Sequence, residues 1–274
     1  MSLDLSNFII DRVLSGVGKS SAGELLFKLN QMQNVSITGG SESTDIVDNV
    51  GTPIMTLYRA KTCEISAESA ILDMNLAAVQ MGAEKMTKAS SASKITAPMF
   101  ETIVVDSTKT SYDLKHEPKV APTYIYELNK DSSLGEKYAY AVDQDGNKAT
   151  TANATGFVLS GKALSIPTGL TAGTELFVAY DYEAEAGIEI VNSAAAFPKS
   201  CELVLRAIGY NPCEKDNKLG CYIIFPSFEM SPDFDLSLNA GDAQSFSGKA
   251  SQDYCSAKKE LMRIVVVDDE DETF

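Results

Sequence analysis

The sequence predicts a mainly β protein with one flanking α-helix and a small inserted β module. Over most of the chain, apolar residues alternate with polar ones, which is the period of a strand with one buried face. After Lys88, short apolar runs recur about every ten residues and are separated by Gly, Pro or Asp-Gly, which is typical of an all-β sandwich. Ser66–Met81 gives the strongest helical pattern.

The first 24 residues are polar and contain several glycines, and they are expected to form a flexible segment in which Asn7–Leu14 is one short helix. Strand follows in Glu24–Ile37, where apolar and polar residues alternate. Thr38–Asn49 contains two glycines and is rich in Ser, Thr and Asp, so its composition predicts a loop. A second strand region is expected in Thr52–Ile65.

Ser66–Met81 is predicted to be the principal helix. The Ser66 hydroxyl can accept a hydrogen bond from a free amide of the first turn, and Glu68 places negative charge where the helix dipole favours it. Gly82 is the expected end. The helix should bury an apolar stripe against a sheet or a neighbour, and the stripe consists of Ala67, Ala70, Ile71, Met74, Ala77, Ala78 and Met81.

The rest of the chain is predicted to form strands. A middle group comprises Met99–Asp106, Thr123–Leu128, Lys137–Val142, Gly156–Leu159, Ala163–Ile166 and Glu175–Tyr182. A late group comprises Lys199–Ile208, Gly220–Phe225, Asp233–Leu238, Ala243–Ala250 and Met262–Val267. The acidic end, Asp268–Glu272, is expected to be a solvated tail.

Pro118–Glu185 has a self-contained set of strands and is bounded by Pro118, Pro122 and Gly187. We therefore predict that residues 118–185 form an inserted, Ig-like β-sandwich module. Residues 1–117 and 186–274 would then form one discontinuous β core domain.

Composition excludes several classes of function. The chain has 38 acidic and 23 basic residues and a net charge of −15, which opposes binding to nucleic acid or to an anionic membrane surface. His116 is the single histidine, so multi-histidine metal sites are excluded. The five cysteines form no CxxC pair, and a chain without a signal peptide or a long apolar run is expected to keep free thiols in a reducing cytoplasm.

Three short motifs contain residues that occur in functional sites. Gly16-Val-Gly-Lys-Ser20 lacks the first glycine of a phosphate-binding loop, because position 13 is valine. Asp143-Gln-Asp-Gly-Asn147 has oxygen ligands without the spacing of a calcium loop, and an Asp-Gly turn explains it. His116 lies before a proline between charged residues and is expected on a surface linker. We predict no catalytic, cofactor or metal site, and no enzyme activity.

Together these features resemble the tail tube proteins of long-tailed bacteriophages and their relatives in contractile injection machines. The resemblance rests on the hairpin Val35–Ile65 with its acidic loop, the helix Ser66–Met81, and the late strands Cys221–Leu238 and Gln244–Ser251. Thr171–Tyr182 also resembles the closing strand of a module inserted in phage structural proteins.

The resemblance implies a tail-tube-like β-sandwich or half-barrel with one flanking helix. It implies that six copies join their sheets into a ring, and that rings stack into a hollow tube through which DNA passes without specific binding. The implied partners are other copies of the chain, a sheath or terminator protein and a tape measure protein. The implied location is the virion tail, assembled in the host cytoplasm, with no membrane anchor.

Five residues of the hairpin are predicted to make contacts between rings or subunits. Glu42, Asp45 and Asp48 carry charge at the tip without a compensating cation, and Ile54 and Leu57 stay apolar on an outward face. The loop is expected to be disordered in a monomer and ordered in a stack.

Two other classes of function remain open: another virion component, such as a capsid or decoration protein, or a cell-surface or carbohydrate-binding β module. A capsid protein would need a long spine helix. A binding module should expose aromatic residues around a cleft. We instead expect the tyrosines of the middle strands in the core or in cross-strand pairs, namely Tyr124, Tyr126, Tyr138, Tyr140, Tyr180 and Tyr182.

Overall fold

The protein is mainly β, as predicted, and divides into two compact units. The first unit comprises Met1–Met86 and Ile190–Phe274, and the second comprises Thr87–Glu189. The computed structural model describes residues 8–267 apart from residues 31, 84–86, 213, 234, 236–238, 240–242 and 253–258. The acidic end and most of the predicted strand Asp233–Leu238 lie outside the described residues.

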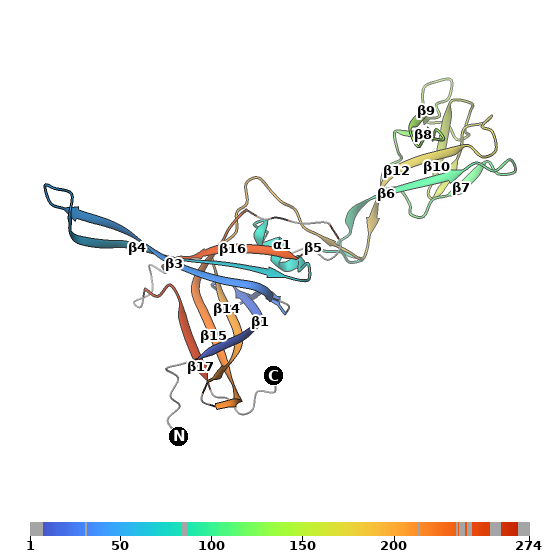
Figure 1. The fold of residues 1–274 in the computed structure, drawn as a ribbon. Helices are drawn as coiled ribbons and strands as arrows, with labels where there is room; N and C mark the ends of the chain where they lie inside the picture. Colours follow the sequence, from blue (N-terminus) through green and yellow to red (C-terminus); the bar gives the residue numbers. More distant parts are fainter. Residues whose placement is uncertain are drawn as a thin grey trace. The chain divides into compact units, whose positions relative to one another are not determined.

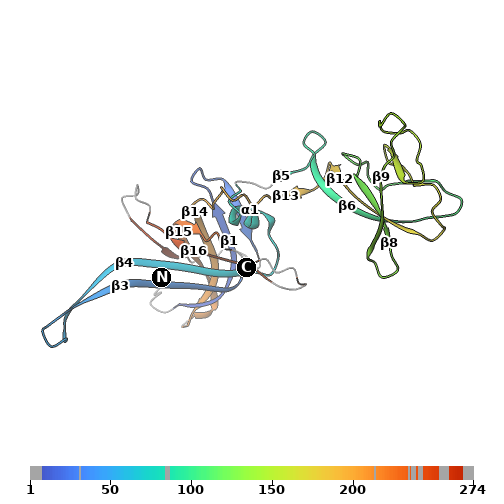
Figure 2. The same ribbon diagram turned by 90° about the horizontal axis from the view of Figure 1, so that it is seen from above.

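The described part of the first unit is built on one eight-stranded sheet. Figures 1 and 2 show that this sheet is curled into a half-barrel. Its strand order is β2-β1-β14-β15-β16-β4-β3, with β17 paired to β15. The strands are β1 (Ile9–Lys19), β2 (Leu25–Leu29), β3 (Met32–Val47), β4 (Pro53–Ser69), β14 (Cys201–Asn211), β15 (Glu214–Met230), β16 (Gln244–Ala250) and β17 (Arg263–Val267).

The core of the first unit follows the period-two pattern of the sequence. Along β14, alternate residues are buried, and Leu203 and Leu205 are fully so. They pack with Phe27 of β2, Phe225 of β15 and Leu76 of the helix. The opposite face of the sheet carries the intervening residues, many of which are polar.

The predicted helix Asn7–Leu14 is wrong, and so is the prediction that the N-terminal segment is flexible. Residues 9–19 form β1, which pairs with β2 on one side and β14 on the other. Two register shifts, between Ile10 and Arg12 and between Val13 and Ser15, interrupt the alternation. These irregularities place apolar residues at spacings that imitate a helix.

The predicted loop Thr38–Asn49 is also wrong. Its residues continue β3, which pairs with β4 from Met32 opposite Ser69 to Val47 opposite Pro53. Only the turn at residues 48–52 connects the two strands. The loop-like composition arises because most of this hairpin has no buried face, so small polar residues occupy both sides.

The helix is much shorter than predicted. Ser66–Ser69 belong to β4, and α1 spans Met74–Gln80. Asp73, not Ser66, caps it, because an Asp73 side-chain oxygen accepts the Leu76 N–H at 2.8 Å. Ala67 pairs with Phe246 of β16 and is buried there, so its apolar character reflects strand packing. Gly82 does end the helix, with a φ of +76°.

The second unit contains a seven-stranded sheet in the order β6-β12-β8-β9-β10-β11-β7. The middle group of predicted strands is confirmed in it, with small shifts at the ends. The strands are β6 (Ile95–Val104), β7 (Ser111–Asp113), β8 (Tyr124–Leu128), β9 (Leu134–Tyr140), β10 (Gly156–Ser160), β11 (Ala163–Ser165) and β12 (Glu175–Ala184). A short pair, β5 (Thr87–Lys88) and β13 (Ile188–Glu189), completes this unit.

The second unit begins before the predicted insert. β6 pairs with β12 along the whole strand, from Val104 opposite Glu175 to Ile95 opposite Ala184, so residues before Pro118 share its core. Ile125, Leu176 and Val178 are fully buried in that core. Independent folding of residues 118–185 stays a prediction.

Candidate functional site

The hairpin of β3 and β4 extends beyond the sheet of the first unit. We call residues 41–59 the arm; in Figure 1 its tip is the blue hairpin that leaves the sheet. Within the arm only Asp48 and Leu57 are half-buried, and the other side chains are exposed. The arm therefore has almost no packing partner in its own unit.

Apolar side chains lie on both faces of the arm. Ile46 is opposite Met55, and Leu57 follows on the same face. The other face carries Ile54 and Tyr58, which are 69% and 74% exposed. The exposed large apolar residues of the arm are Ile46, Val47, Val50, Ile54, Met55 and Tyr58. Exposed apolar side chains on both faces of a strand pair are suited to burial between other surfaces.

Two of the three predicted acidic contact residues of the arm, Asp45 and Asp48, accept hydrogen bonds within the hairpin. Asp48 accepts the N–H groups of Thr52 and Val50 at 2.8 and 2.9 Å, and these bonds lower the pKa of its carboxyl. Asp45 accepts the Thr56 hydroxyl at 2.7 Å. Glu42 lies directly opposite Arg59.

The five predicted contact residues are thus all on the arm, but they do not form one surface. Ile54 and Leu57 point to opposite faces, while Asp48 shapes the turn. Whether any of them contacts another subunit stays a prediction. The prediction omitted Ile46 and Val47, although this apolar pair inside a polar segment was the available signal.

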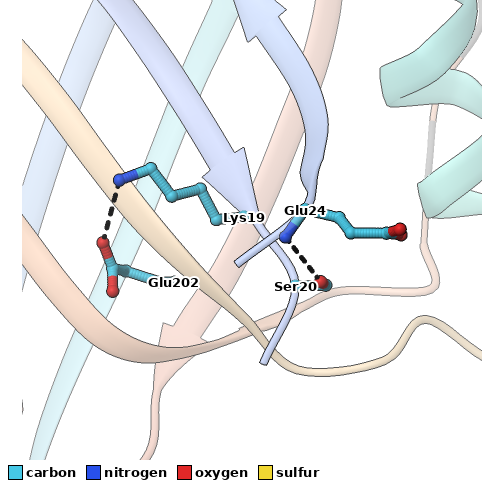
Figure 3. Close-up of polar contacts among 4 residues, drawn as sticks. All are labelled: Lys19, Ser20, Glu24 and Glu202. Atoms are coloured by element: carbon cyan, nitrogen blue, oxygen red, sulfur yellow. Dashed lines mark hydrogen bonds and ion pairs between the residues drawn. The ribbon is translucent and has the colours of Figure 1, made fainter. Parts of the chain in front are cut away.

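The polar face of the first-unit sheet carries paired charges. Lys19 on β1 lies 3.5 Å from Glu202 on β14, and Lys249 on β16 lies 3.2 Å from Glu64 on β4. Figure 3 shows the Lys19–Glu202 pair beside the turn in which Ser20 Oγ accepts the Glu24 N–H. The Lys19 ammonium therefore lies within ion-pair distance of a carboxylate, and residues 16–19 belong to strand β1.

A cavity of about 350 Å³ opens at the root of the arm. Its lining includes Thr38, Glu64, Ser66, Ser247 and Lys249, so hydroxyl groups and one ion pair surround it. A larger cavity of about 630 Å³ lies between the Ser20–Glu24 turn and the end of α1.

The other weighed motifs have structural roles. Asp143 accepts the N–H groups of Asp145 and Asn147, and Gly146 has a φ of +80°, so the predicted turn is confirmed. His116 stacks on Tyr182 with ring centroids 3.9 Å apart. Among the described residues, no group of three or more His, Cys, Asp or Glu could hold a metal ion. None of the described helices is long and apolar enough to cross a membrane.

A curled sheet that projects a long hairpin with exposed apolar side chains on both faces is suited to a structural role in an assembly. Comparison with known proteins makes this specific: the chain belongs to the YomU/Tube protein family, whose family model matches residues 9–264. A tail tube protein of Bacillus phage SPR is 24% identical over 226 residues, which cover 82% of this chain and 75% of that protein. The resemblance inferred from the sequence is confirmed.

Proposed function

We propose that the protein is the subunit of a phage tail tube and polymerises as stacked rings. The observation that carries the proposal is the arm, whose exposed apolar residues lie on both faces and have little to pack against in their own unit. Burial of apolar surface is the main driving force of protein association. The family and the name of the Bacillus phage relative support the same role.

The proposed contact is heterologous, which means that the arm of one copy packs on a different surface of the next. Head-to-tail contacts of this kind extend into open assemblies when they do not close on themselves. Ile54 and Leu57 would be buried on opposite sides of the inserted arm. We expect six copies per ring, with rings stacked along the tube.

DNA would pass through the lumen without specific binding. The net charge of −15 repels phosphate over distance, and both Lys19 and Lys249 are already paired with carboxylates on the polar face. This face would line the channel, in keeping with its serines and paired charges. The protein would act without catalysis, in the virion tail, after assembly in the host cytoplasm with a sheath or terminator protein and a tape measure protein.

Shortening the arm tests the proposal. Residues 43–58 would be replaced by Asn-Gly, so that the facing pair Glu42 and Arg59 is closed by a two-residue hairpin turn. We expect a soluble monomer with the parent's melting temperature and no tubes in negative-stain micrographs. The matched control is Val120→Asp, at a site that is 72% exposed outside the arm, and it should still polymerise.

Three possible results would contradict the proposal or favour an alternative. Tubes formed by the shortened protein as readily as by the parent would contradict the role of the arm. Assembly lost equally in Val120→Asp would mean that polymerisation responds to any surface change. A parent protein that gives closed shells instead of tubes would favour the capsid or decoration alternative.

A further inference from the structure

The outer face of the second-unit sheet carries a continuous row of aromatic side chains. Phe100 of β6, Phe177 of β12, and Tyr124 and Tyr126 of β8 share this face, since the strand register places Phe177 between Thr102 and Tyr126. Phe100 is 63% and Tyr124 39% exposed. The sequence predicts these tyrosines in the core or in cross-strand pairs. Tyr138 and Tyr180 are core residues, whereas Tyr124 is exposed and lies opposite Ala139 of β9.

Small residues lie beside two of these aromatic side chains on the same face of the sheet. Ala179 lies opposite Phe100, and Ala139 lies opposite Tyr124. The Phe100 and Phe177 rings are nearly parallel, with an interplanar angle of 9° and centroids 6.1 Å apart. The face thus presents a shallow row of rings instead of a deep pocket.

Hydrogen-bonding groups border this row. Thr102 and Lys137 lie on either side of the Phe177–Tyr126 pair in the same register row, and Glu175 lies one row away on β12. The Lys137 ammonium is 4.9 Å from the centre of the Tyr124 ring, which fixes that ring on the sheet surface. Both donors and acceptors are therefore available beside the aromatic faces.

We propose that this aromatic row binds a neutral polysaccharide whose pyranose rings are gluco-configured. Such a ring has an apolar face of C–H groups and a rim of hydroxyls. The C–H face suits the electron-rich face of an aromatic side chain, while Thr102, Lys137 and Glu175 can bond the hydroxyls. β6 is an edge of the sheet, so a longer glycan could extend past Phe100.

Charge disfavours the ligands that otherwise use aromatic rows. Residues 87–189 contain nine Lys and no Arg against fourteen Asp and Glu, a net charge of −5. A single-stranded nucleic acid would need a positive groove beside the rings. An anionic polymer would meet the same repulsion, whereas a neutral glycan would not. This inference does not depend on the proposed tube assembly.

The test is calorimetric titration of the full-length protein with two soluble probes, the β-1,4-linked tetramers of glucose and of N-acetylglucosamine. At least one should bind, and Phe100→Ala should weaken that binding at least about tenfold. Tyr124→Ala should also weaken it, and it serves as the second variant if Phe100→Ala lowers the melting temperature. Val142→Ala, a 56% exposed site outside the row, should leave binding unchanged.

Absence of binding by both tetramers at millimolar concentration would overturn the proposal. It would also be overturned if Val142→Ala weakened binding as much as Phe100→Ala. Sedimentation velocity of the same variants distinguishes a self-interface: if Phe100→Ala changes the oligomeric state and no tetramer binds, the row packs against a second copy instead of a glycan.

Discussion

Gln244 on β16 donates a hydrogen bond from its side-chain amide to the side-chain oxygen Oε1 of Gln80 on α1, at 3.2 Å. Gln80 in turn donates to the Ser245 carbonyl at 3.0 Å, and Gln244 accepts the Asp73 N–H at 2.9 Å. Both glutamines are buried. This network joins a helix of only seven residues to the sheet, where apolar contacts alone would fix its position less specifically.

Gln80→Leu should destabilise the first unit by about 1–3 kcal/mol, because the Gln244 amide and the Ser245 carbonyl would lose a buried partner. Gln33→Leu, the same change at an exposed site on β3, is the control and should have little effect. Urea unfolding followed by circular dichroism measures both. Equal stability of the two variants would show that the network adds nothing to folding.

Gly18→Ala should destabilise the protein by about 1–3 kcal/mol, because the added methyl group would overlap the Phe27 ring. Gly39 on β3 is the matched control, since a Cβ there would meet only the Thr62 carbonyl oxygen, at 3.9 Å. Gly39→Ala should be neutral or slightly stabilising. Thermal unfolding of both variants checks the prediction, and a Gly18→Ala protein as stable as Gly39→Ala would contradict it.

How far the sequence predicts the fold depends on whether a segment has one buried face. β12 and β14 each have one buried face, and the alternation of their apolar and polar residues predicts both strands correctly. The arm has none, so the sequence predicts a loop for its β3 half, although it correctly predicts a strand for its β4 half, and the bulges of β1 produce a false helix. The sequence predicts that the small and apolar residues of Ser66–Ser69 belong to the helix. In the structure they end a partly buried strand that comes shortly before a short helix, and the two elements together give one continuous apolar pattern in the sequence.

The candidate site was predicted only in part for the same reason. Ile54 and Leu57 stand out because they are apolar in a strand of alternating pattern. Ile46 and Val47 face solvent in a segment whose polar composition indicated no structure. The register that brings Ile46 opposite Met55 depends on the turn at Asp48, and pairing across a hairpin is set by that turn and not by either strand alone.

Tyr180→Phe should change how the stability of the second unit depends on alkaline pH. Burial and the hydrogen bond to Glu101 raise the pKa of Tyr180 to about 12. The folded state therefore holds this proton more tightly than the unfolded state, so its contribution is fully present below about pH 10 and is lost as pH rises toward 12. The variant should be less stable at neutral pH and should lose less stability between pH 10 and 12.

Fluorescence-detected urea unfolding of both proteins across this pH range measures the difference. Tyr112→Phe offers a comparison, since the Tyr112 hydroxyl on β7 accepts the Asp106 N–H. If the parent and Tyr180→Phe lose stability in parallel above pH 10, the raised pKa of Tyr180 does not contribute to folding.

The buried thiols of the first unit should resist alkylation while the protein is folded. Cys63, Cys201 and Cys221 are buried and unpaired with one another, and burial raises the pKa of Cys201 to about 11. The reactive thiolate is therefore rare at pH 8, and the reagent has no access to it. Iodoacetamide treatment followed by peptide mass spectrometry should find these three sites unmodified in native protein and modified in urea. Reductant should leave the melting temperature unchanged, whereas a disulfide would typically add about 2–4 kcal/mol to the free energy of unfolding.

Rapid native labelling of Cys201 at pH 8 would show that the sheet opens locally around β14, and it would contradict the close packing of that strand.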